Sequence, residues 1–223
     1  MDMIQAAHER HSVRAYEDKP LPSGVKSALE KKIKELNERS GLHIQLVTDE
    51  PKAFDSFMAH YGKFSGVKNY FAMVGRTDKD LMEKCGYYGE VLVLYAQILG
   101  LNTCWVALTY KKITGAYDVE EGERLALVIA VGYGKTQGTA HVNRPRSEVS
   151  EAPLNAPSWY LQGIEGALLA PTALNQQKFK FTLSDGNKVK AEAGRGFYAK
   201  IDLGIARYQF ELFAGKENFE WLK

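Results

Sequence analysis

Residues 78–101, DKDLMEKCGYYGEVLVLYAQILGL, constrain the fold most, because they predict one long helix that is apolar around nearly its whole circumference. The residues at helical spacing are Leu81, Cys85, Tyr88, Leu92, Tyr95 and Leu99, with further apolar residues between them. Such a helix has no polar face to turn toward water, so it must lie at the centre of the protein. Residues 124–134, RLALVIAVGYG, are an uninterrupted apolar run, which is typical of a strand buried on both faces. We therefore expect an α+β fold built around these two segments.

The other segments predict helices that pack against a central mixed or antiparallel sheet. Strands are expected at 42–49, where apolar and polar residues alternate, and at 69–76, which is a short apolar run. Further helices are expected at 2–10, 23–41, 51–62 and 113–125, the last of them with a turn. In the helix that begins at Ser23, this serine is expected to act as the N-cap and Gly41 to end the helix.

The second half of the chain echoes the first. Residues 157–189 read as helix, loop, strand and turn, in the same order as residues 21–52. Residues 198–219 echo residues 83–103, and both place a glycine early in a helix and another near its end. Helix–turn–strand units recur in many α+β proteins, so the echo alone leaves internal duplication and coincidence equally open.

A polar segment with three prolines, residues 135–158, is expected to be a long connector or arm. We expect it to join two intertwined lobes of one globular unit, residues 1–150 and residues 151–223.

Charge and motifs exclude several classes of function. The formal net charge of +2 does not favour general binding to nucleic acid or a membrane surface. Residues 1–12 contain no apolar core of a signal peptide, and no run approaches the roughly 18 apolar residues of a membrane span, so a cytoplasmic protein is expected. Cys85 and Cys104 lie in apolar surroundings and are expected to be buried thiols, with no metal site. Motifs for phosphate loops, dinucleotide folds, zinc proteases and α/β-hydrolases are absent, so no nucleophile or catalytic base stands out.

Three polar elements suit a large, planar, anionic ligand. The first is RHSVR, in which Arg10, Ser12 and Arg14 occupy every second position of a short segment. Guanidinium groups match the geometry of phosphate oxygens, and a hydroxyl group adds another hydrogen bond. The alternative is an exposed helix end whose arginines pair with neighbouring carboxylates.

The second element is Arg144-Pro145-Arg146, where proline keeps the backbone extended so that both arginines can serve one face. A solvated linker would have the same sequence. The third element, LLAPTALNQQKF, clusters one hydroxyl and three amides after an apolar helix, and amides can both donate to and accept from a heteroaromatic ring edge. An ordinary helix end and loop is again the alternative.

Taken together, these elements resemble the FMN-dependent nitroreductase family. The resemblance rests on RHSVR with AYEDKPLP after it, on ILGLNTCWVA at the end of the buried helix, and on VIAVGYG followed by NRPRSEV. Their order and spacing cover nearly the whole chain. The family implies a nitroreductase-like α+β fold with FMN as cofactor. It also implies hydride transfer from NAD(P)H to flavin N5 and then, in ping-pong order, to a small electron acceptor such as a nitroaromatic or a quinone.

The resemblance also implies roles for individual residues. Those expected at the phosphate and ribityl end of the flavin are Arg10, His11, Ser12, Arg14, Arg144 and Arg146. Arg14 is expected beside the ribityl chain or the pyrimidine edge of the ring. Those expected at the ring are Pro171, Thr172, Asn175 and Gln177, with the backbone of Ala107 and Leu108 near N5. No catalytic side chain is implied, because a flavin carries the chemistry itself.

One departure from the family pattern is informative. Ordinary members have a loop after the first helix that is lent to the partner subunit's flavin, but here the similar loop, APTALNQQKF, lies in the second half. The chain therefore resembles a fused and trimmed pseudo-dimer, the branch typified by thermophile nitroreductases, with one flavin per chain and a monomeric or weakly dimeric state. Two alternatives stay open: a flavin-binding or sensor protein without efficient turnover, and a scaffold without cofactor.

Overall fold

The computed structural model describes residues 1–222, and the chain divides into two compact units. The antiparallel-sheet unit comprises residues 9–81 and 92–140. The mixed-sheet unit comprises residues 1–8, 82–91 and the chain from His141 onward. Both units combine helices with a four-stranded sheet, which confirms the α+β class.

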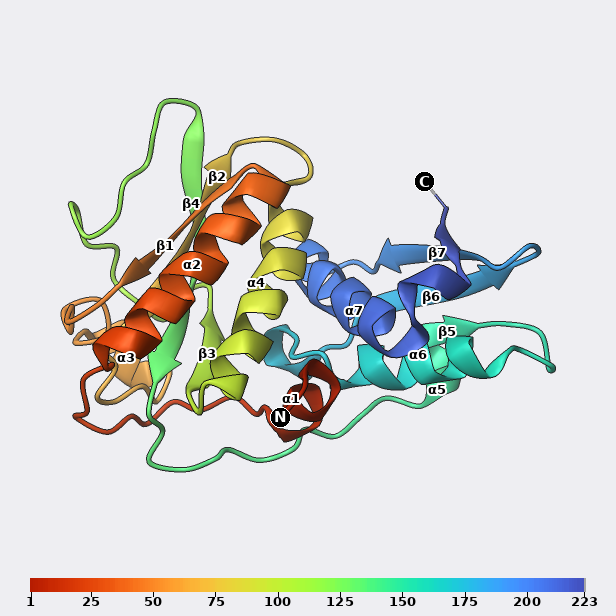
Figure 1. Ribbon diagram of the computed structural model, residues 1–223, viewed down its shortest axis with the longest axis horizontal. Coiled ribbons are helices and arrows are strands. Elements are labelled where there is room, and N and C mark those ends of the chain that lie inside the picture. Colours follow the sequence, from red (N-terminus) through yellow and green to blue (C-terminus); the bar gives the residue numbers. More distant parts are fainter. Residues whose placement is uncertain (223) are drawn as a thin grey trace. The chain divides into compact units, whose positions relative to one another are not determined.

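In the antiparallel-sheet unit, the strands are β1 (Leu42–Val47), β2 (Tyr70–Arg76), β3 (Asn102–Val106) and β4 (Glu123–Gly132). They lie in the order β1-β2-β4-β3 with every pair antiparallel. Helix α2 (Ser23–Ser40) packs along this sheet, and the short α3 (Phe57–Tyr61) lies in the β1–β2 connection (Figure 1). Strand β4 is buried along nearly its whole length, as its apolar run predicts.

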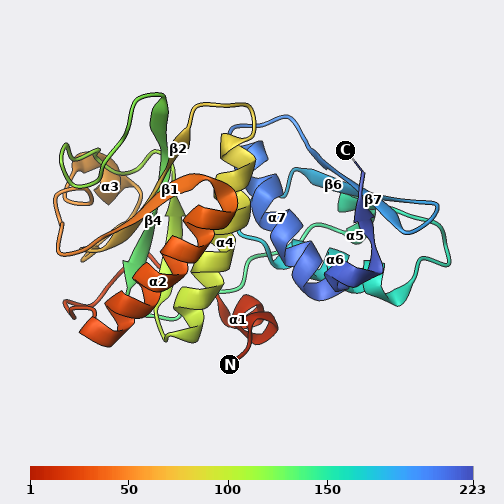
Figure 2. The same cartoon turned by 45° about the horizontal axis from the view of Figure 1, so that its top comes forward.

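The mixed-sheet unit holds most of the remaining elements. Its helices are α1 (Met3–Glu9), α5 (Arg146–Val149), α6 (Ser158–Leu169), α7 (Ala199–Ala214) and the short 3₁₀ turns η1 (Ala173–Asn175) and η2 (Lys216–Asn218). Its strands are β5 (Ser150–Glu151), β6 (Phe179–Ser184), β7 (Lys188–Ala193) and β8 (Glu220–Trp221). The β6–β7 hairpin is antiparallel (Figure 2). The two short outer strands, β5 and β8, pair with it in parallel. The core of this unit is aromatic, with the rings of Phe181 and Phe210 stacked 4.8 Å apart.

Helix α4 (Leu81–Ile98) runs from one unit into the other, and each of its residues is buried or half-buried. This confirms the central helix predicted from its apolar circumference. Both cysteines, Cys85 on α4 and Cys104 on β3, are buried. Within residues 1–222, none of the helices is both long enough and apolar enough to cross a membrane.

Three local predictions were wrong. Residues 113–122 form turns in place of a helix, because Gly115 and Gly122 adopt positive φ angles (both 80°) that interrupt helical geometry. The helix expected at 51–62 is reduced to α3. Its N-cap is Ser56, whose side chain accepts a hydrogen bond from the Ala59 N–H. Ser23 does not cap α2 with its side chain, because it is the first helical residue and Pro22, whose ψ is 150°, occupies the N-cap position.

Candidate functional site

The segment 10–14 runs beside β3 in the antiparallel-sheet unit. The Val13 N–H donates to the Thr103 carbonyl oxygen (3.0 Å), and Ser12 pairs with Thr103 in a parallel bridge. The Val13 side chain is buried in the core of this unit. Because side chains alternate along an extended backbone, the side chain of Ser12 lies on the opposite face from Val13. The core contact of Val13 thereby fixes the direction of the polar residues on either side of it.

These polar residues converge on Cys104. Burial raises the pKa of the Cys104 thiol, whereas the Arg14 guanidinium, a hydrogen bond with Ser12 and the Arg10 guanidinium all act in the opposite direction. All three groups of the RHSVR segment therefore lie close enough to one atom to act on it. Arg10 itself is only 3% exposed, while Arg14 is exposed. The every-second-residue spacing has produced a local concentration of positive charge.

The connector after β4 passes directly against this segment. At Gly138, whose φ is 72°, a Cβ atom would lie 2.8 Å from the Cβ of His11 and 3.0 Å from the Ser12 carbonyl oxygen. The buried Asn102 holds the connector in place, because its Oδ1 accepts from the Gly134 N–H (2.9 Å) and its Nδ2 donates to Gln137 Oε1 (3.0 Å). Sequence reasoning missed Asn102, whose only signal was a polar residue at the start of an otherwise buried strand.

Ala107 and Leu108 follow the end of β3 in the same unit. Val106, the last residue of the strand, is buried, whereas Ala107 is half-buried and the Leu108 side chain is 67% exposed. The chain therefore reaches the protein surface at Leu108. Neither of the two residues that follow β3 is a glycine.

The remaining predicted residues lie in the mixed-sheet unit, where both arginines of the RPR sequence are ion-paired. Arg144 Nη1 lies 2.7 Å from Glu148 Oε2, one helical turn away, and Arg146 pairs with Glu165 on α6. The four side chains are about half exposed. Pairs of this kind contribute little to stability, so the guanidiniums can exchange their carboxylate partners for another anion at small cost.

The buried Gln177 is the centre of a hydrogen-bond network. Its Oε1 accepts from the Arg144 backbone N–H (3.0 Å), and its Nε2 donates to the Val142 carbonyl oxygen and to Asn175 Oδ1 (both 2.8 Å). The Asn175 Nδ2 donates to the same Val142 oxygen (2.8 Å), and Thr172 Oγ1 accepts from the Gln177 N–H (3.0 Å). The structure thus brings Arg144, Thr172, Asn175 and Gln177 together through the connector backbone.

The loop that carries these amides is conformationally strained. Leu174, Asn175 and Gln177 have positive φ angles of 52°, 53° and 43°, although none of them is glycine. The preceding Pro171 is buried, and the Leu174 side chain is fully exposed. Such strain persists only where the surroundings dictate the backbone path, and it is concentrated at ligand clamps and active sites.

A buried carboxylate supplies that support. Asp202, in the first turn of α7, is 2% exposed and accepts hydrogen bonds from the Ala173 N–H (3.0 Å) and Gln176 Nε2 (2.6 Å). Burial raises the pKa of the Asp202 carboxyl to about 6, against the lowering effect of these two hydrogen bonds. Sequence reasoning missed this residue. The available signal was a single acidic residue within the otherwise apolar stretch IDLGIA.

Comparison with solved structures identifies similar folds. A nitroreductase structure from Thermotoga maritima matches with a TM-score of 0.69 and 24% identity, over 97% of this chain and 85% of the other. A nitroreductase from Desulfovibrio desulfuricans, solved in complex with FMN, matches with a TM-score of 0.51 and 17% identity, over 70% of this chain and 98% of the other. A nitroreductase family protein from Streptococcus pneumoniae has the same TM-score with 14% identity, over 66% and 98% of the two chains. These likenesses confirm the nitroreductase-like α+β fold.

No curated protein matches the chain. The family model described as "Putative TM nitroreductase" matches residues 2–214, which include every residue of the candidate site. The match therefore extends across both units and is not limited to a shared sheet. On this basis, the chain belongs to the nitroreductase family.

Proposed function

We propose that this protein is an FMN-dependent oxidoreductase that uses NAD(P)H. Membership of the nitroreductase family supports an oxidoreductase, and one structural neighbour with the same fold was solved with FMN. When bound, FMN would supply the redox chemistry by accepting hydride from NAD(P)H at N5 and passing it to a small acceptor such as a nitroaromatic or a quinone. The residues of the chain would bind the flavin, orient it and keep its pocket in shape.

The observation that carries this proposal is the convergence of Arg10, Ser12 and Arg14. Two guanidiniums and one hydroxyl act on a single buried thiol, so they surround one small region with positive charge and hydrogen-bonding capacity. A phosphate group requires such a donor set, and Arg10 is held in place by burial. The residues present therefore fit the phosphate end of FMN. Arg144 and Arg146 are proposed to add to the same charge when they leave their surface carboxylates.

The loop residues have different proposed roles in the same site. Asn175 is exposed and is proposed to hydrogen-bond the polar edge of the flavin ring. Gln177 is only 2% exposed, and both ends of its amide already bind protein groups, which supports a role in holding the loop near the ring. Pro171 and Thr172 are proposed to shape this loop. Ala107 and Leu108 would present their backbone near N5.

We further propose that the chain is a fused pseudo-dimer with one flavin per chain, in which the second half supplies the partner loop. A reciprocal contact between α4 and α7 supports this. A Cβ atom at Gly86 would lie 2.1 Å from the Ile201 carbonyl oxygen, and one at Gly204 would lie 2.1 Å from the Glu83 oxygen. Ile201 lies three positions before Gly204, and Glu83 lies three positions before Gly86, so the two contacts are equivalent. Contacts in which i meets j and j meets i characterise two-fold interfaces.

The two-fold relation predicts equal costs at the two glycines. Gly86→Ala and Gly204→Ala should each lower the free energy of unfolding by about 3 kcal/mol, because each new methyl group meets a backbone carbonyl that cannot rotate away. Gly24→Ala on α2 is the control, since its Cβ would meet nothing within 4 Å, and this change should raise stability by about 0.5–1 kcal/mol. If urea unfolding shows that only one of the two helix-contact variants is destabilised, the symmetry argument fails.

Titration with FMN tests the cofactor assignment. The purified protein should quench FMN fluorescence at one equivalent per chain, and Arg14→Gln should weaken binding about 10- to 100-fold through loss of a charge-assisted hydrogen bond. Arg39→Gln, an exposed arginine paired with Glu35 on α2, is the matched control and should leave affinity unchanged. Equal effects of the two changes would remove the phosphate assignment.

Oxidation of NADH and NADPH with a quinone acceptor then separates the enzyme from the flavin-binding or sensor protein. Turnover that depends on added FMN is expected. FMN binding without turnover would instead favour the sensor. The missing glycine after β3, where the exposed Leu108 stands, is the feature that would account for exclusion of the nicotinamide.

A further inference from the structure

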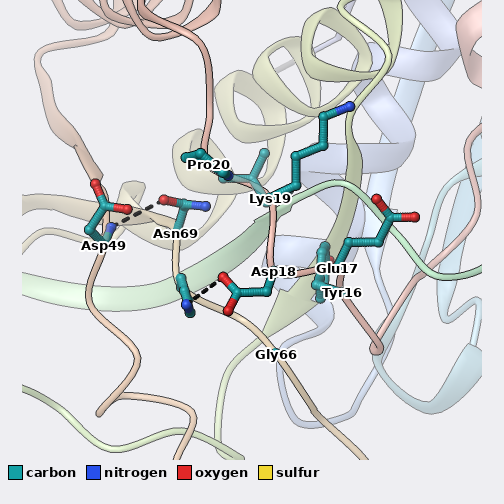
Figure 3. A pocket seen from close by; sticks show the side chains of 11 residues that line it. Tyr16, Glu17, Asp18, Lys19, Pro20, Asp49, Gly66 and Asn69 are labelled. Carbon is teal, nitrogen blue, oxygen red and sulfur yellow. Dashed lines mark hydrogen bonds and ion pairs between the residues drawn. The ribbon is translucent and has the colours of Figure 1, made fainter.

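The antiparallel-sheet unit contains a cavity of about 220 Å³ that none of the proposed flavin-binding residues lines. Its walls come from the chain after the RHSVR segment, from the loop before β2 and from the end of β4 (Figure 3). Its lining includes Tyr16, Asp18, Pro20, Lys68, Asn69 and Val131. Pockets for drug-sized ligands span roughly 300–1,000 Å³, so this cavity suits a molecule of about one ring.

Asn69 directs a hydrogen-bond donor into this space. The residue is 5% exposed, and its Oδ1 accepts from the Asp49 backbone N–H (3.2 Å). A backbone N–H can only donate, so this bond fixes the oxygen toward Asp49 and the amide nitrogen away from it. Figure 3 shows the nitrogen pointing toward the space between Pro20 and Asp18. Within residues 1–222, the Asn69 Nδ2 makes no hydrogen bond. The nitrogen is open to the cavity, so a ligand that enters the cavity can supply its acceptor.

The cavity lining carries three carboxylates, on Glu17, Asp18 and Asp49, and two ammonium groups, on Lys19 and Lys68. Asp18 Oδ1 lies 2.5 Å from Lys68 Nζ, and Asp49 Oδ2 lies 3.2 Å from Lys26 Nζ. The Lys19 ammonium group lies over the Tyr133 ring, 3.9 Å from its centroid. An anionic ligand would therefore add like charge to a lining that already has more carboxylates than ammonium groups, whereas a neutral ligand would not. The Asp18 carboxylate keeps lone pairs that can accept an N–H from such a ligand.

The rest of the wall is apolar and closely packed. Tyr16 and Val131 are 2% and 1% exposed. A Cβ atom at Gly66 would lie only 2.3 Å from the Tyr16 carbonyl oxygen, so the chain segments on the two sides of the cavity are already at their closest approach. The wall therefore offers a fixed apolar surface beside one donor and one acceptor.

We propose that this cavity binds a small neutral carboxamide. Its carbonyl oxygen accepts from Asn69 Nδ2, its N–H donates to the Asp18 carboxylate, and its apolar part packs against Tyr16, Pro20 and Val131. A carboxamide carries one acceptor and one donor on a single planar group, which matches the two polar groups, and it adds no negative charge to the carboxylates of the lining. The site is independent of the proposed flavin site.

Three probes of the same size test this proposal by NMR titration of the full-length protein: benzamide, benzoate and acetophenone. Benzamide should shift the backbone resonances of Gly66, Asn69 and Gly132, with and without saturating FMN. Benzoate, which is charged, and acetophenone, which lacks the N–H, should bind at least tenfold more weakly. These comparisons use the unaltered protein, so they decide the question even if a variant fails to fold.

Asn69→Asp is the matched variant, because it keeps an oxygen for the Asp49 N–H and removes the donor. It should weaken benzamide at least tenfold, while Asn155→Asp, an exposed change, should have no effect. The proposal is overturned if saturating benzamide leaves these resonances unmoved, if benzoate or acetophenone binds as tightly, or if folded Asn69→Asp retains full affinity. Failure of FMN binding would leave every one of these outcomes unchanged.

Discussion

The segment 10–14 and the loop 172–177 are both polar, but they use their side chains in opposite ways. The segment is held by its backbone and by the buried Val13, so its arginines and serine are directed at one common region. The loop is held by its own side chains, because Gln177 and Thr172 bind backbone groups and Asp202 anchors it from α7. The polar groups of the segment are therefore available for the proposed ligand, whereas those of the loop keep a strained backbone in shape.

Substitutions in the segment and in the loop should therefore have different effects. A change in the segment should affect affinity for an anion with little effect on folding, since its polar groups are not what holds the backbone. A change in the loop should affect folding first, since the strain at Leu174, Asn175 and Gln177 is balanced by side-chain hydrogen bonds. The following predictions test this contrast.

The largest effect is expected at Gln177. Gln177→Ala removes a buried amide and leaves the Arg144 N–H without its acceptor, so the free energy of unfolding should fall by about 3 kcal/mol. Urea unfolding followed by fluorescence measures this change. Gln162→Ala, an exposed glutamine on α6, should change stability by less than about 0.5 kcal/mol. If the two variants unfold alike, the loop does not depend on its side chains.

Sequence patterns predicted the features that depend on spacing along the chain. The burial of α4 and β4 followed from their apolar runs, and the clustering of Arg10, Ser12 and Arg14 from their alternation. The end of α2 followed from the glycine at position 41, which adopts a positive φ of 69° in the structure. Each of these depends on residues that are neighbours in sequence, so periodicity is enough to reveal them.

Features that depend on distant contacts could not be predicted. Asp202 and Asn102 hold segments about 30 residues away, and Gln177 binds backbone groups of the connector that lie 33 and 35 residues before it. The turns at 113–122 replaced a predicted helix because two glycines take positive φ, while Ile113 and Tyr117 still pack against the core. Composition gives the polarity of such residues, but only the folded backbone decides what they contact.

The second effect is expected at Asp202 and depends on pH. Its folded-state pKa is raised to about 6 from an ordinary value of 3.8, so between these values the folded state holds a proton that the unfolded state has released. Stability should therefore fall as pH rises from about 4 to 6 and then level off, a change of about 2–3 kcal/mol. Asp202→Asn cannot titrate and should remove this slope, as measured by urea unfolding across the range.

The control for this pH dependence is Asp185→Asn, an exposed change in the β6–β7 turn, which should preserve the slope. A wild-type stability that rises between pH 4 and pH 6 by the same amount would show that the carboxylate of Asp202 is favoured by its two hydrogen bonds more than it is penalised by burial.

The smallest effect is expected in the segment itself. Arg14→Gln should change the free energy of unfolding by less than about 0.5 kcal/mol, because the exposed guanidinium does not hold the backbone. The same change should raise the pKa of the Cys104 thiol further, since it removes the largest of the influences that lower it. The ¹³Cβ shift of Cys104 followed against pH measures this, with Arg39→Gln as control. An unchanged thiol pKa would mean that the Arg14 guanidinium does not act on the region around Cys104. The contrast between the segment and the loop would then fail at Arg14.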